Sequence, residues 1–240
     1  MYYTGQFEKD LKEWNIVLSE KQIQQFLTFY EMLAEWNEKI NLTAITEYNE
    51  VMKKHFVDSL SLTQAFNLSG SLTLIDVGTG AGFPGLPLKI AFPNLKVTLL
   101  DSLNKRVQFL NAVIDELGLE DIEAVHGRAE DYAKENLLRE KYDLCVSRAV
   151  ANLTTLSEYC IPFVKKCGSF ISYKSEKAAD EIEQAKKAIH LLGGSLEKQV
   201  ELQLPNSDIY RNLVVINKKT ASPKKYPRKA GLPAKEPLFC

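Results

Sequence analysis

One short stretch, from Leu72 to Pro84, constrains the fold more than any other part of the chain. It reads LTLIDVGTGAGFP, an apolar and partly β-branched run followed by Gly78, Gly80 and Gly82. The apolar run is typical of a strand buried on both faces. The glycines allow positive φ and let the backbone approach a ligand closely, and Pro84 suits the first turn of a following helix. The stretch therefore predicts a strand, a ligand-binding loop and a helix start.

A second strand is expected at Lys96 to Leu100, and it ends in Asp101. An acidic side chain at that strand end can accept hydrogen bonds from both hydroxyls of a ribose, which predicts an adenosine-type cofactor. A dinucleotide loop reads G-x-G-x-x-G, whereas here the third glycine comes one position early and Phe83 stands in place of the last glycine. The spacing favours S-adenosylmethionine over a nicotinamide cofactor, because S-adenosylmethionine has no phosphate to place on a helix N-terminus.

Length and composition suit one sizeable α/β domain with an appended piece. A chain of 240 residues can bury a core, and 45% hydrophobic with 25% charged residues is ordinary for a soluble globular protein. The four cysteines include no C-x-x-C pair, so we expect neither structural zinc nor a disulfide framework. Residues 1–14 lack the apolar core of a signal peptide, and no run approaches membrane-spanning length. We therefore expect a cytoplasmic protein without a metal or a membrane partner.

The net charge of −1 conceals a basic C-terminus. Residues 218–240 carry seven Lys or Arg and one acidic residue, which is +6, and leave −7 for the rest of the chain. The prolines of this segment hold it extended, and cations along an extended chain suit a phosphate backbone. Lys224, Lys225, Arg228 and Lys229 are therefore candidate nucleic-acid contacts. A disordered terminus without a partner is the alternative.

Strands and helices alternate through the middle of the chain, which predicts a mostly parallel, doubly wound sheet. After the first strand, further strands are expected at residues 96–101, 122–126, 142–146 and 169–173, and an antiparallel pair at residues 196–204 and 211–216. Helices are expected at residues 20–39, 49–67, 85–92, 104–117, 153–165 and 175–192. The expected organisation is a helical extension (1–68), a Rossmann-like domain with seven strands, the last antiparallel (69–217), and a basic extended tail (218–240).

Further site candidates follow the third and fourth expected strands, and one lies in the helix expected at residues 49–67. Ala129 and Glu130 follow the third strand, where a backbone N–H and a carboxylate can meet an adenine edge; Glu130 can equally be a solvated capping residue of the next helix. Arg148 follows the fourth strand, and it can clamp a carboxylate or a base oxygen but cannot act as a general base. His55 either faces a substrate or is a satisfied structural group, and a lone histidine beside apolar neighbours is more often the latter.

Taken in order, these motifs resemble the ribosomal small-subunit methyltransferase G family, also called glucose-inhibited division protein B. The resemblance covers nearly the whole chain and is carried by Trp36-Asn37, Asn41-Leu42-Thr43, His55, Asp58-Ser59-Leu60, Asp76 to Gly85, Asp101-Ser102, Lys105-Arg106, Arg128 to Glu130, Ser147-Arg148-Ala149, Arg211-Asn212 and Tyr226 to Lys229. It implies a class I S-adenosylmethionine-dependent methyltransferase that methylates N7 of one guanine in 16S ribosomal RNA, with the small ribosomal subunit as partner.

The resemblance also implies the roles of individual residues. Cofactor-binding positions are Gly78, Gly80 of the same loop, Phe83, Asp101 at the ribose, Ala129, Glu130 and Arg148. Basic positions that the resemblance places near the site, and that we expect to contact RNA, are Arg128, Lys174 and Arg211. Guanine N7 has a lone pair and no proton, so the reaction needs alignment and no general base. Arg148 is accordingly expected to position the reactants without removing a proton.

Two other readings stay open from the sequence. A methyltransferase of a protein or small molecule would leave the basic tail dispensable. A non-catalytic, ribosome-associated module would bind the cofactor without turnover. Nothing in the sequence demands an oligomer, so a monomer is expected.

Overall fold

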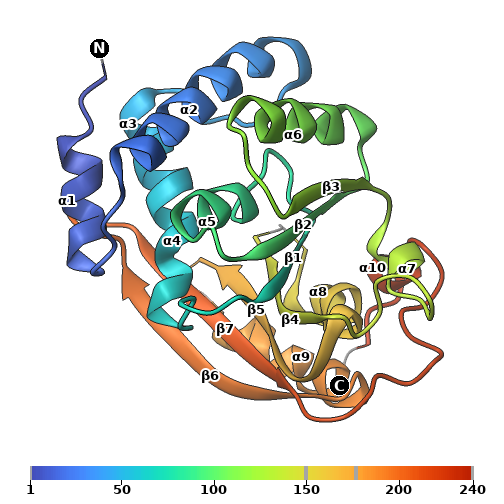
Figure 1. Ribbon diagram of the computed structural model, residues 1–240. Helices are drawn as coiled ribbons and strands as arrows, with labels where there is room; N and C mark the ends of the chain where they lie inside the picture. Colours follow the sequence, from blue (N-terminus) through green and yellow to red (C-terminus); the bar gives the residue numbers. More distant parts are fainter. Residues whose placement is uncertain (1, 149–150, 176–177, 239–240) are drawn as a thin grey trace.

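Seven strands form one sheet at the centre of the computed structural model (Figure 1). They are β1 (Thr73–Val77), β2 (Lys96–Asp101), β3 (Ile122–His126), β4 (Tyr142–Ser147), β5 (Val164–Lys174), β6 (Gly194–Gln203) and β7 (Tyr210–Lys218). Their order is β3-β2-β1-β4-β5-β7-β6, and β7 runs antiparallel to both β5 and β6 while the other pairs are parallel. The predicted mostly parallel sheet with an antiparallel last strand is confirmed.

The structure describes residues 2–148, 151–175 and 178–238. Ala149 of the Ser147-Arg148-Ala149 motif and Cys240 therefore lie outside the described residues. Among the residues within those ranges, no helix combines the length and apolar character needed to cross a lipid bilayer.

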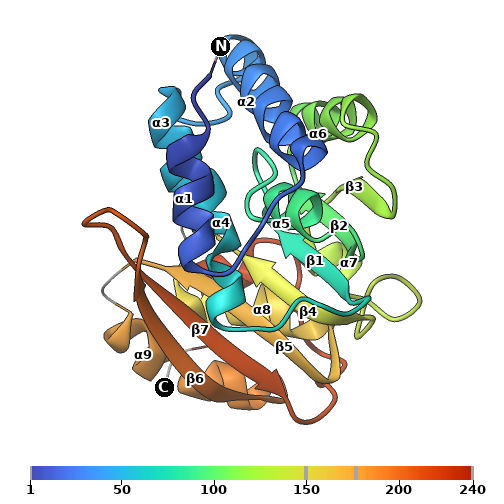
Figure 2. The same cartoon turned by 60° about the vertical axis from the view of Figure 1, so that its left-hand side comes forward.

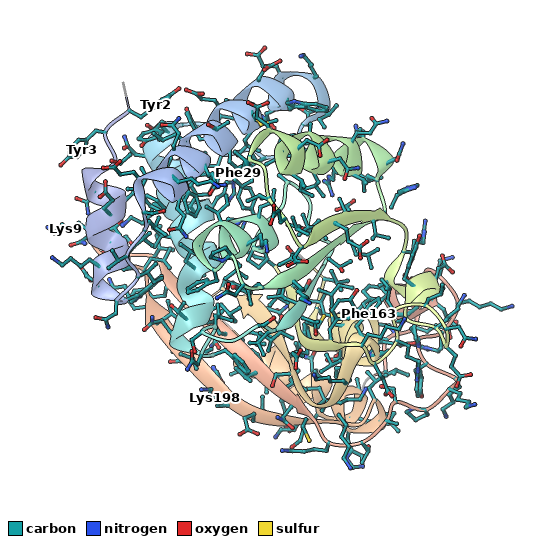
Figure 3. All side chains as sticks on the ribbon, viewed as in Figure 1. Tyr2, Tyr3, Lys9, Phe29, Phe163 and Lys198 are labelled. Atoms are coloured by element: carbon teal, nitrogen blue, oxygen red, sulfur yellow. The ribbon has the colours of Figure 1, made fainter. Side chains whose placement is uncertain are left out.

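Helices cover both faces of the sheet (Figures 1 and 2). The helices of the first face are α1 (Gly5–Glu13), α2 (Glu20–Ile40), α3 (Tyr48–Val51), α4 (Asp58–Leu60), α5 (Gly85–Ala91) and α6 (Asn104–Glu116). The second face carries α8 (Leu153–Cys160) and α9 (Ala179–Leu191), with the short α7 (Ala129–Tyr132) and α10 (Leu232–Lys235) at its edge. Each face has its own hydrophobic cluster, in which Phe29 and Phe163 are fully buried (Figure 3).

The register of the central strands brings three predicted features to one edge of the sheet. Asp76 of β1 pairs with Leu99 of β2 and with Val146 of β4. The glycine loop, the end of β2 and the end of β4 consequently leave the sheet side by side. In an open α/β sheet this carboxyl edge is the usual ligand site.

Several boundaries differ from the predicted ones, each for a local reason. The helix expected at 49–67 is divided: α3 is followed by a π-helical turn, η1 (Met52–Val57), then by α4 and a 3₁₀ turn, η2 (Ser61–Gln64). A hydrophobic pattern cannot reveal the residue that a π turn inserts. The helix expected at 153–165 ends at Cys160, because Pro162 lies in a 3₁₀ turn, η3 (Ile161–Phe163), and β5 begins directly afterwards.

Two terminal segments also depart from expectation. Helix α1 has no counterpart in the predicted elements, since its apolar signal consists of little more than Phe7 and Leu11, both buried. The basic tail is not a free extended strand: it folds back on the domain, forms α10, and buries Tyr226 in the second hydrophobic cluster. The capping box of α2 at Ser19 and Gln22 is present as predicted.

Candidate active site

The glycine loop after β1 needs its glycines for two different reasons. Gly78, Gly80 and Gly82 all have positive φ, at 73°, 63° and 94°. A Cβ on Gly82 would lie 2.3 Å from a methyl carbon of Leu86, so this position also requires close packing of the loop on α5. A Cβ on Gly80 would meet nothing within 4 Å. Gly80 thus faces open space, which leaves room for a ligand to lie against its backbone.

Asp76 lies beneath the loop and ties its two ends together. Its Oδ2 accepts hydrogen bonds from the Thr79 hydroxyl at 2.7 Å and from the Gly85 N–H at 2.8 Å, whereas its buried Oδ1 has no partner among the described residues. Burial raises the pKa of Asp76 to about 7, although the two hydrogen bonds act in the opposite direction. The sequence motif contains Asp76, but no role was predicted for it.

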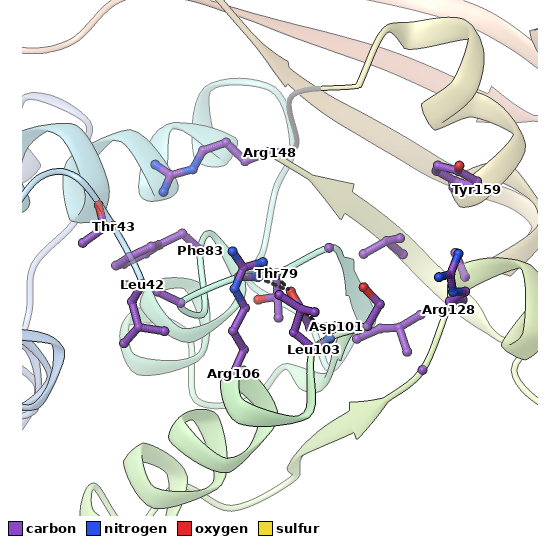
Figure 4. A pocket seen from close by; sticks show the side chains of 18 of the residues that line it. Leu42, Thr43, Thr79, Phe83, Asp101, Leu103, Arg106, Arg128, Arg148 and Tyr159 are labelled. Atoms are coloured by element: carbon purple, nitrogen blue, oxygen red, sulfur yellow. Dashed lines mark hydrogen bonds and ion pairs between the residues drawn. The ribbon is translucent and has the colours of Figure 1, made fainter. Parts of the chain in front are cut away.

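Asp101, predicted to bind a ribose, also shapes the loop. Its Oδ2 accepts the Gly80 N–H at 2.9 Å and its Oδ1 accepts the Leu103 N–H at 2.9 Å. Arg106 reaches Oδ2 at 3.4 Å (Figure 4), which is long for a charge-assisted hydrogen bond. Two carboxylate oxygens offer about four acceptor sites, so Asp101 keeps acceptor capacity for a ligand hydroxyl, most readily in place of Arg106.

A cavity of about 640 Å³ lies between these groups and the ends of β3 and β4. In Figure 4, Arg148 and Phe83 occupy one end of it, and Arg128 and Tyr159 occupy the other. The predicted cofactor residues that line this cavity are Gly78, Gly80, Phe83, Asp101, Ala129, Glu130 and Arg148. Its size is that of a small-molecule site, and the open face of Gly80 together with the spare acceptor capacity of Asp101 fits an adenosine-containing cofactor.

Arg148 is held at its end of the cavity by several groups. Nη1 donates to Asp58 Oδ2 at 2.9 Å and to the backbone oxygen of Lys54 at 3.1 Å, and Nη2 donates to His55 Nδ1 at 3.1 Å. The guanidinium carbon lies 5.0 Å from the centre of the Phe83 ring. Of the five N–H groups of a guanidinium, these contacts use three. Counting only partners within the described ranges, two N–H groups therefore remain for a ligand.

Asp58 joins Arg148 to a second predicted residue, Arg211. Its Oδ1 accepts from Arg211 Nε at 2.9 Å, and the Asp58 side chain is only 3% exposed. No role was predicted for Asp58, because it lies 90 residues from Arg148 and 153 residues from Arg211 in the sequence. The Asp58-Ser59-Leu60 motif was its sole signal. The negative charge of the buried Asp58 carboxylate offsets the positive charges of both guanidinium groups. Without it, both arginines would lose this counter-charge.

A second cavity of about 410 Å³ adjoins the first and shares His55 and Arg148 with it. Its other lining residues are Ile45, Lys54, Asp58, Tyr173, Lys174, Ser175 and Arg211. Lys174, predicted to lie near the site, donates to the backbone oxygen of Ala151 at 2.9 Å and pairs with Glu181 at 2.7 Å. Lys174 and Arg211 are thus brought together at the second cavity, whereas Arg128 lies at the far end of the first.

His55 belongs to the site and is a neutral imidazole. Because the Arg148 guanidinium can only donate, Nδ1 of His55 accepts, and its proton is on Nε2, 2.8 Å from Thr43 Oγ1. Burial, reinforced by the charge of Arg148, lowers the pKa of His55 to about 3. The ring stacks on Phe83 with a centroid distance of 4.4 Å. The structural reading is confirmed, since both ring nitrogens of His55 have partners. His55 also lines both cavities, and a role toward a substrate stays a prediction.

The four basic candidates of the tail lie in different environments. The guanidinium of Arg228 pairs with buried Glu158, with Nη2 at 2.6 Å from Oε2. Lys224 pairs with exposed Glu135 at 3.0 Å, Lys225 lies 5.2 Å from the centre of the Tyr226 ring, and Lys229 is exposed. Arg228 is therefore engaged by the protein itself, while the three lysines remain at the surface.

Comparison with solved structures identifies the fold. A methyltransferase from Pyrococcus furiosus superposes with a TM-score of 0.56 over 84% of this chain and 100% of its own, at 14% identity. TrmN from Thermus thermophilus superposes with a TM-score of 0.52 over 67% of this chain and 48% of its own, at 16% identity. At such low identity the likeness concerns the fold, which is that of class I methyltransferases.

Comparison of sequences is more specific. The family model described as rRNA small subunit methyltransferase G matches residues 22–210. Proteins named ribosomal RNA small subunit methyltransferase G are 56% identical in Alkaliphilus metalliredigens, over 95% of both chains, and 52% identical in Lachnoclostridium phytofermentans, over 97% of this chain and 96% of the relative. The relative from Staphylococcus aureus strain Newman is 51% identical over 96% of both chains. With the glycine loop, Asp101 and Arg148 gathered at one cavity, these matches show that the chain belongs to the rRNA small subunit methyltransferase G family.

Proposed function

We propose that the chain transfers the methyl group of S-adenosylmethionine to N7 of a guanine in 16S ribosomal RNA, acting in the cytoplasm on the small ribosomal subunit. Membership of the family supports the cofactor, the reaction and the RNA class. The observation that carries the proposal is the pair of adjoining cavities, which share His55 and Arg148. One cavity has the groups expected for an adenosine-containing cofactor, and the other is lined by cationic side chains.

In the first cavity, we assign each residue to the part of the cofactor that it can bind chemically. The backbone at Gly78 and Gly80 lies against the cofactor, and the Asp101 carboxylate accepts from the ribose hydroxyls. The N–H of Ala129, the first residue of α7, and the carboxylate of Glu130 meet the adenine edge. When bound, S-adenosylmethionine supplies an electrophilic methyl group on a sulfonium.

The second cavity is the proposed place of the acceptor guanine. Guanine presents two acceptors side by side, N7 and O6, and an arginine is the common partner of such an edge. Arg148 lies at the boundary of the two cavities, and two of its N–H groups have no hydrogen-bond partner among the residues that the structure describes. It can direct one of them at guanine O6 or at the carboxylate of the cofactor. Lys174 and Arg211 add positive charge next to the phosphates of the flanking nucleotides.

No residue of this site needs to accept a proton. The N7 lone pair of guanine is available without deprotonation, and Arg148 stays protonated. The Nδ1 lone pair of His55 is already taken by Arg148, and its pKa of about 3 keeps the ring neutral. The residues therefore act by holding the nucleophile in line with the methyl group, and the carboxylate of Asp58 offsets the two guanidinium charges beside the reacting atoms.

The surface around the site supports an RNA partner. Lys224, Lys225 and Lys229 are proposed to contact RNA phosphates, since their side chains are exposed. Arg128 is proposed to do so at the outer end of the first cavity. Arg228 is left out of this proposal because Glu158 holds it. The division into a helical extension (1–68), a methyltransferase domain (69–217) and a tail (218–240), acting as a monomer, remains part of the proposal.

The test measures product and reacting atom together. Purified protein is incubated with methyl-labelled S-adenosylmethionine and small ribosomal subunits that lack the modification, and the RNA is digested to nucleosides for mass spectrometry. We expect labelled 7-methylguanosine. Lys174→Ala should reduce its rate of formation about tenfold, while Lys198→Ala, which removes an exposed charge on β6 (Figure 3), should not. Label in another nucleoside, or none in RNA despite bound cofactor, would refute the proposal.

A further inference from the structure

The C-terminal segment contacts a residue that lines the cofactor cavity. Residues 222–236, called the strap below, follow β7 after a short gap, contact α8 through Arg228 and Pro233, and include α10, which lies beside α7 (Figure 1). Glu130 and Tyr159, which line the end of the cavity opposite Arg148, belong to α7 and α8. The strap therefore packs against the two elements that form this end of the site.

The strap is anchored by a buried ion pair. Glu158 is 1% exposed, and it accepts from Arg228 through the backbone N–H at 2.8 Å, through Nε at 2.9 Å and through Nη2 at 2.6 Å. Arg228 Nη2 also donates to the backbone oxygen of Glu236 at 2.8 Å, which closes the strap on itself. Separating a buried pair of this kind is costly because each charge would lose its partner. The anchor therefore holds the strap firmly in one position.

A second anchor holds the beginning of the strap. The guanidinium of Arg139 donates to the backbone oxygens of Tyr226 and Ser222, both at 2.7 Å. The backbone N–H of Ser222 donates to Glu140 at 2.8 Å. Backbone groups, rather than exposed lysine side chains, make these contacts. The path of the strap is consequently set by the protein and not by a bound nucleic acid.

Between these anchors and α10, the strap touches a residue of the cofactor cavity. The N–H of Gly231 donates to Glu130 Oε1 at 2.8 Å. Gly231 has φ of +83°, a conformation that glycine adopts without strain, and it is the N-cap residue just before α10. Within the described part of the chain, this is the one hydrogen bond that the Glu130 carboxylate makes, although the side chain is 5% exposed. Its Oε2 is left for another donor.

We infer that the strap positions Glu130 for the adenine of the cofactor, with Gly231 as the positioning residue. The inference rests on the proposed function, in which the Glu130 carboxylate meets the adenine edge. The 6-amino group is the donor at that edge, so it is the group from which Glu130 accepts. Gly231 engages Oε1 and thereby fixes the orientation of Oε2, so the strap sets the preference for adenine over a purine without that amino group. Because linkage is reciprocal, a bound adenine also stabilises the contact between Gly231 and Glu130.

A truncation provides the first test. A chain ending at Ala230 keeps the ion pair of Arg228 and Glu158 but lacks Gly231 and α10. Dissociation constants are measured by calorimetry, without RNA, for S-adenosylhomocysteine and for its deaminated analogue S-inosylhomocysteine. We expect the full chain to prefer the adenine ligand by more than tenfold, the size expected for a hydrogen bond to a charged group. The truncated chain should bind S-adenosylhomocysteine about tenfold more weakly. It should also lose most of its preference for S-adenosylhomocysteine over S-inosylhomocysteine.

Turnover distinguishes positioning from a general loss of structure. With the truncated chain, the KM for S-adenosylmethionine should rise about tenfold while kcat at saturating cofactor stays within about twofold. The control is Lys235→Ala, which removes an exposed charge of α10 and leaves the strap in place. It should leave the preference unchanged. A folded truncated chain, checked by circular dichroism, that keeps the full adenine preference would overturn the inference.

Hydrogen exchange on the intact protein gives an answer even where the truncated chain does not fold. Saturating S-adenosylhomocysteine should slow the exchange of the Gly231 amide at least fivefold, and S-inosylhomocysteine should slow it less. Equal exchange with and without the adenine ligand would contradict the inference. Calorimetry and hydrogen exchange use neither RNA nor methyl transfer, so a failure of the rRNA methylation assay and a failure of the strap are separate results.

Discussion

The two ends of the cofactor cavity are built in different ways. At one end, the buried carboxylate of Asp58 (α4) joins two partly buried arginines, Arg148 after β4 and Arg211 of β7. At the other end, Glu130 of α7 receives a single backbone N–H from the strap. The first end depends on a balance of charges from three distant elements. The second depends on the position of one backbone group.

This difference predicts unequal sensitivity to substitution. Removing one member of a buried charge network leaves the others uncompensated, which costs several kcal/mol. Removing one neutral donor from a carboxylate that can still reach water costs less. We therefore expect variants at the Arg148 end to affect catalysis and folding strongly. Variants at the Glu130 end should chiefly change the affinity and selectivity for the cofactor.

Asp58→Asn is expected to have the largest effect. Asparagine keeps the shape but removes the charge between Arg148 and Arg211, so the free energy of unfolding should fall by about 3 kcal/mol. Because Arg148 is no longer held, kcat/KM for the RNA substrate should fall by about 100-fold or more. Urea denaturation and methylation kinetics measure the two effects. Asp115→Asn, at an exposed position of α6, is the matched control. Activity within threefold of wild type would contradict a central role for Asp58.

Measuring the stability of wild type and His55→Gln at several pH values tests the Arg148 end of the cavity further. Glutamine can accept from Arg148 and donate to Thr43 as the neutral imidazole does, but it cannot titrate. The pKa of His55 is about 3 in the folded protein, whereas the usual value of 6.5 applies in the unfolded chain. At a pH between 3 and 6.5, the unfolded chain therefore binds more protons than the folded protein does. The free energy of unfolding of the wild type should therefore fall as the pH is lowered from 6.5.

The size of that effect is bounded by linkage. The wild type should lose up to about 1.4 kcal/mol per pH unit more than His55→Gln below pH 6.5. Urea denaturation at pH 7.5, 6.0 and 5.0 measures the difference between the two proteins. If the two proteins lose stability in parallel, His55 is not the buried neutral group that its contacts indicate.

The smallest effect is expected from substituting exposed lysines that lie at neither end of the cofactor cavity. The double variant Lys224→Ala, Lys225→Ala should lower the slope of log affinity for ribosomal RNA against log salt by about 2. It should leave the affinity for S-adenosylhomocysteine unchanged, because neither side chain lines the cavity. Filter binding at several salt concentrations measures the slope. Lys186→Ala, Lys198→Ala removes two exposed charges elsewhere, and an equal loss in that control would remove the case for a specific RNA surface.

Local signals were sufficient for much of the fold and for half of the site. The run from Leu72 to Pro84 specifies a strand, a positive-φ loop and a helix start through neighbouring residues alone, and the structure has all three. Asp101 was predicted because a strand end can be read from a short apolar run. Alternation of strands and helices was enough for a mostly parallel sheet. These features depend on residues within about one βαβ unit of each other.

Charge contacts between distant elements could not be predicted in this way. Arg211 and Arg148 were singled out as basic residues, but the carboxylate that joins them comes from a helix after a π turn, and hydrophobic periodicity does not register such a turn. Likewise, Arg228 has the composition of an RNA contact, and its engagement by Glu158 depends on where the tail folds back. A sequence shows which residues carry charge but not which charges meet.

By itself, then, the sequence determined the glycine loop after β1, the place of Asp101 at the end of β2 and the succession of strands and helices along the chain, because short-range sterics and hydrophobic patterning decide them. The tertiary structure alone decided that Asp58 balances two arginines, that His55 is neutral, and that Gly231 reaches Glu130. Each of these depends on a hydrogen bond across 90 or more residues, or on burial that only the packed chain creates. The strength of such contacts comes from exclusion of water, which no local pattern encodes.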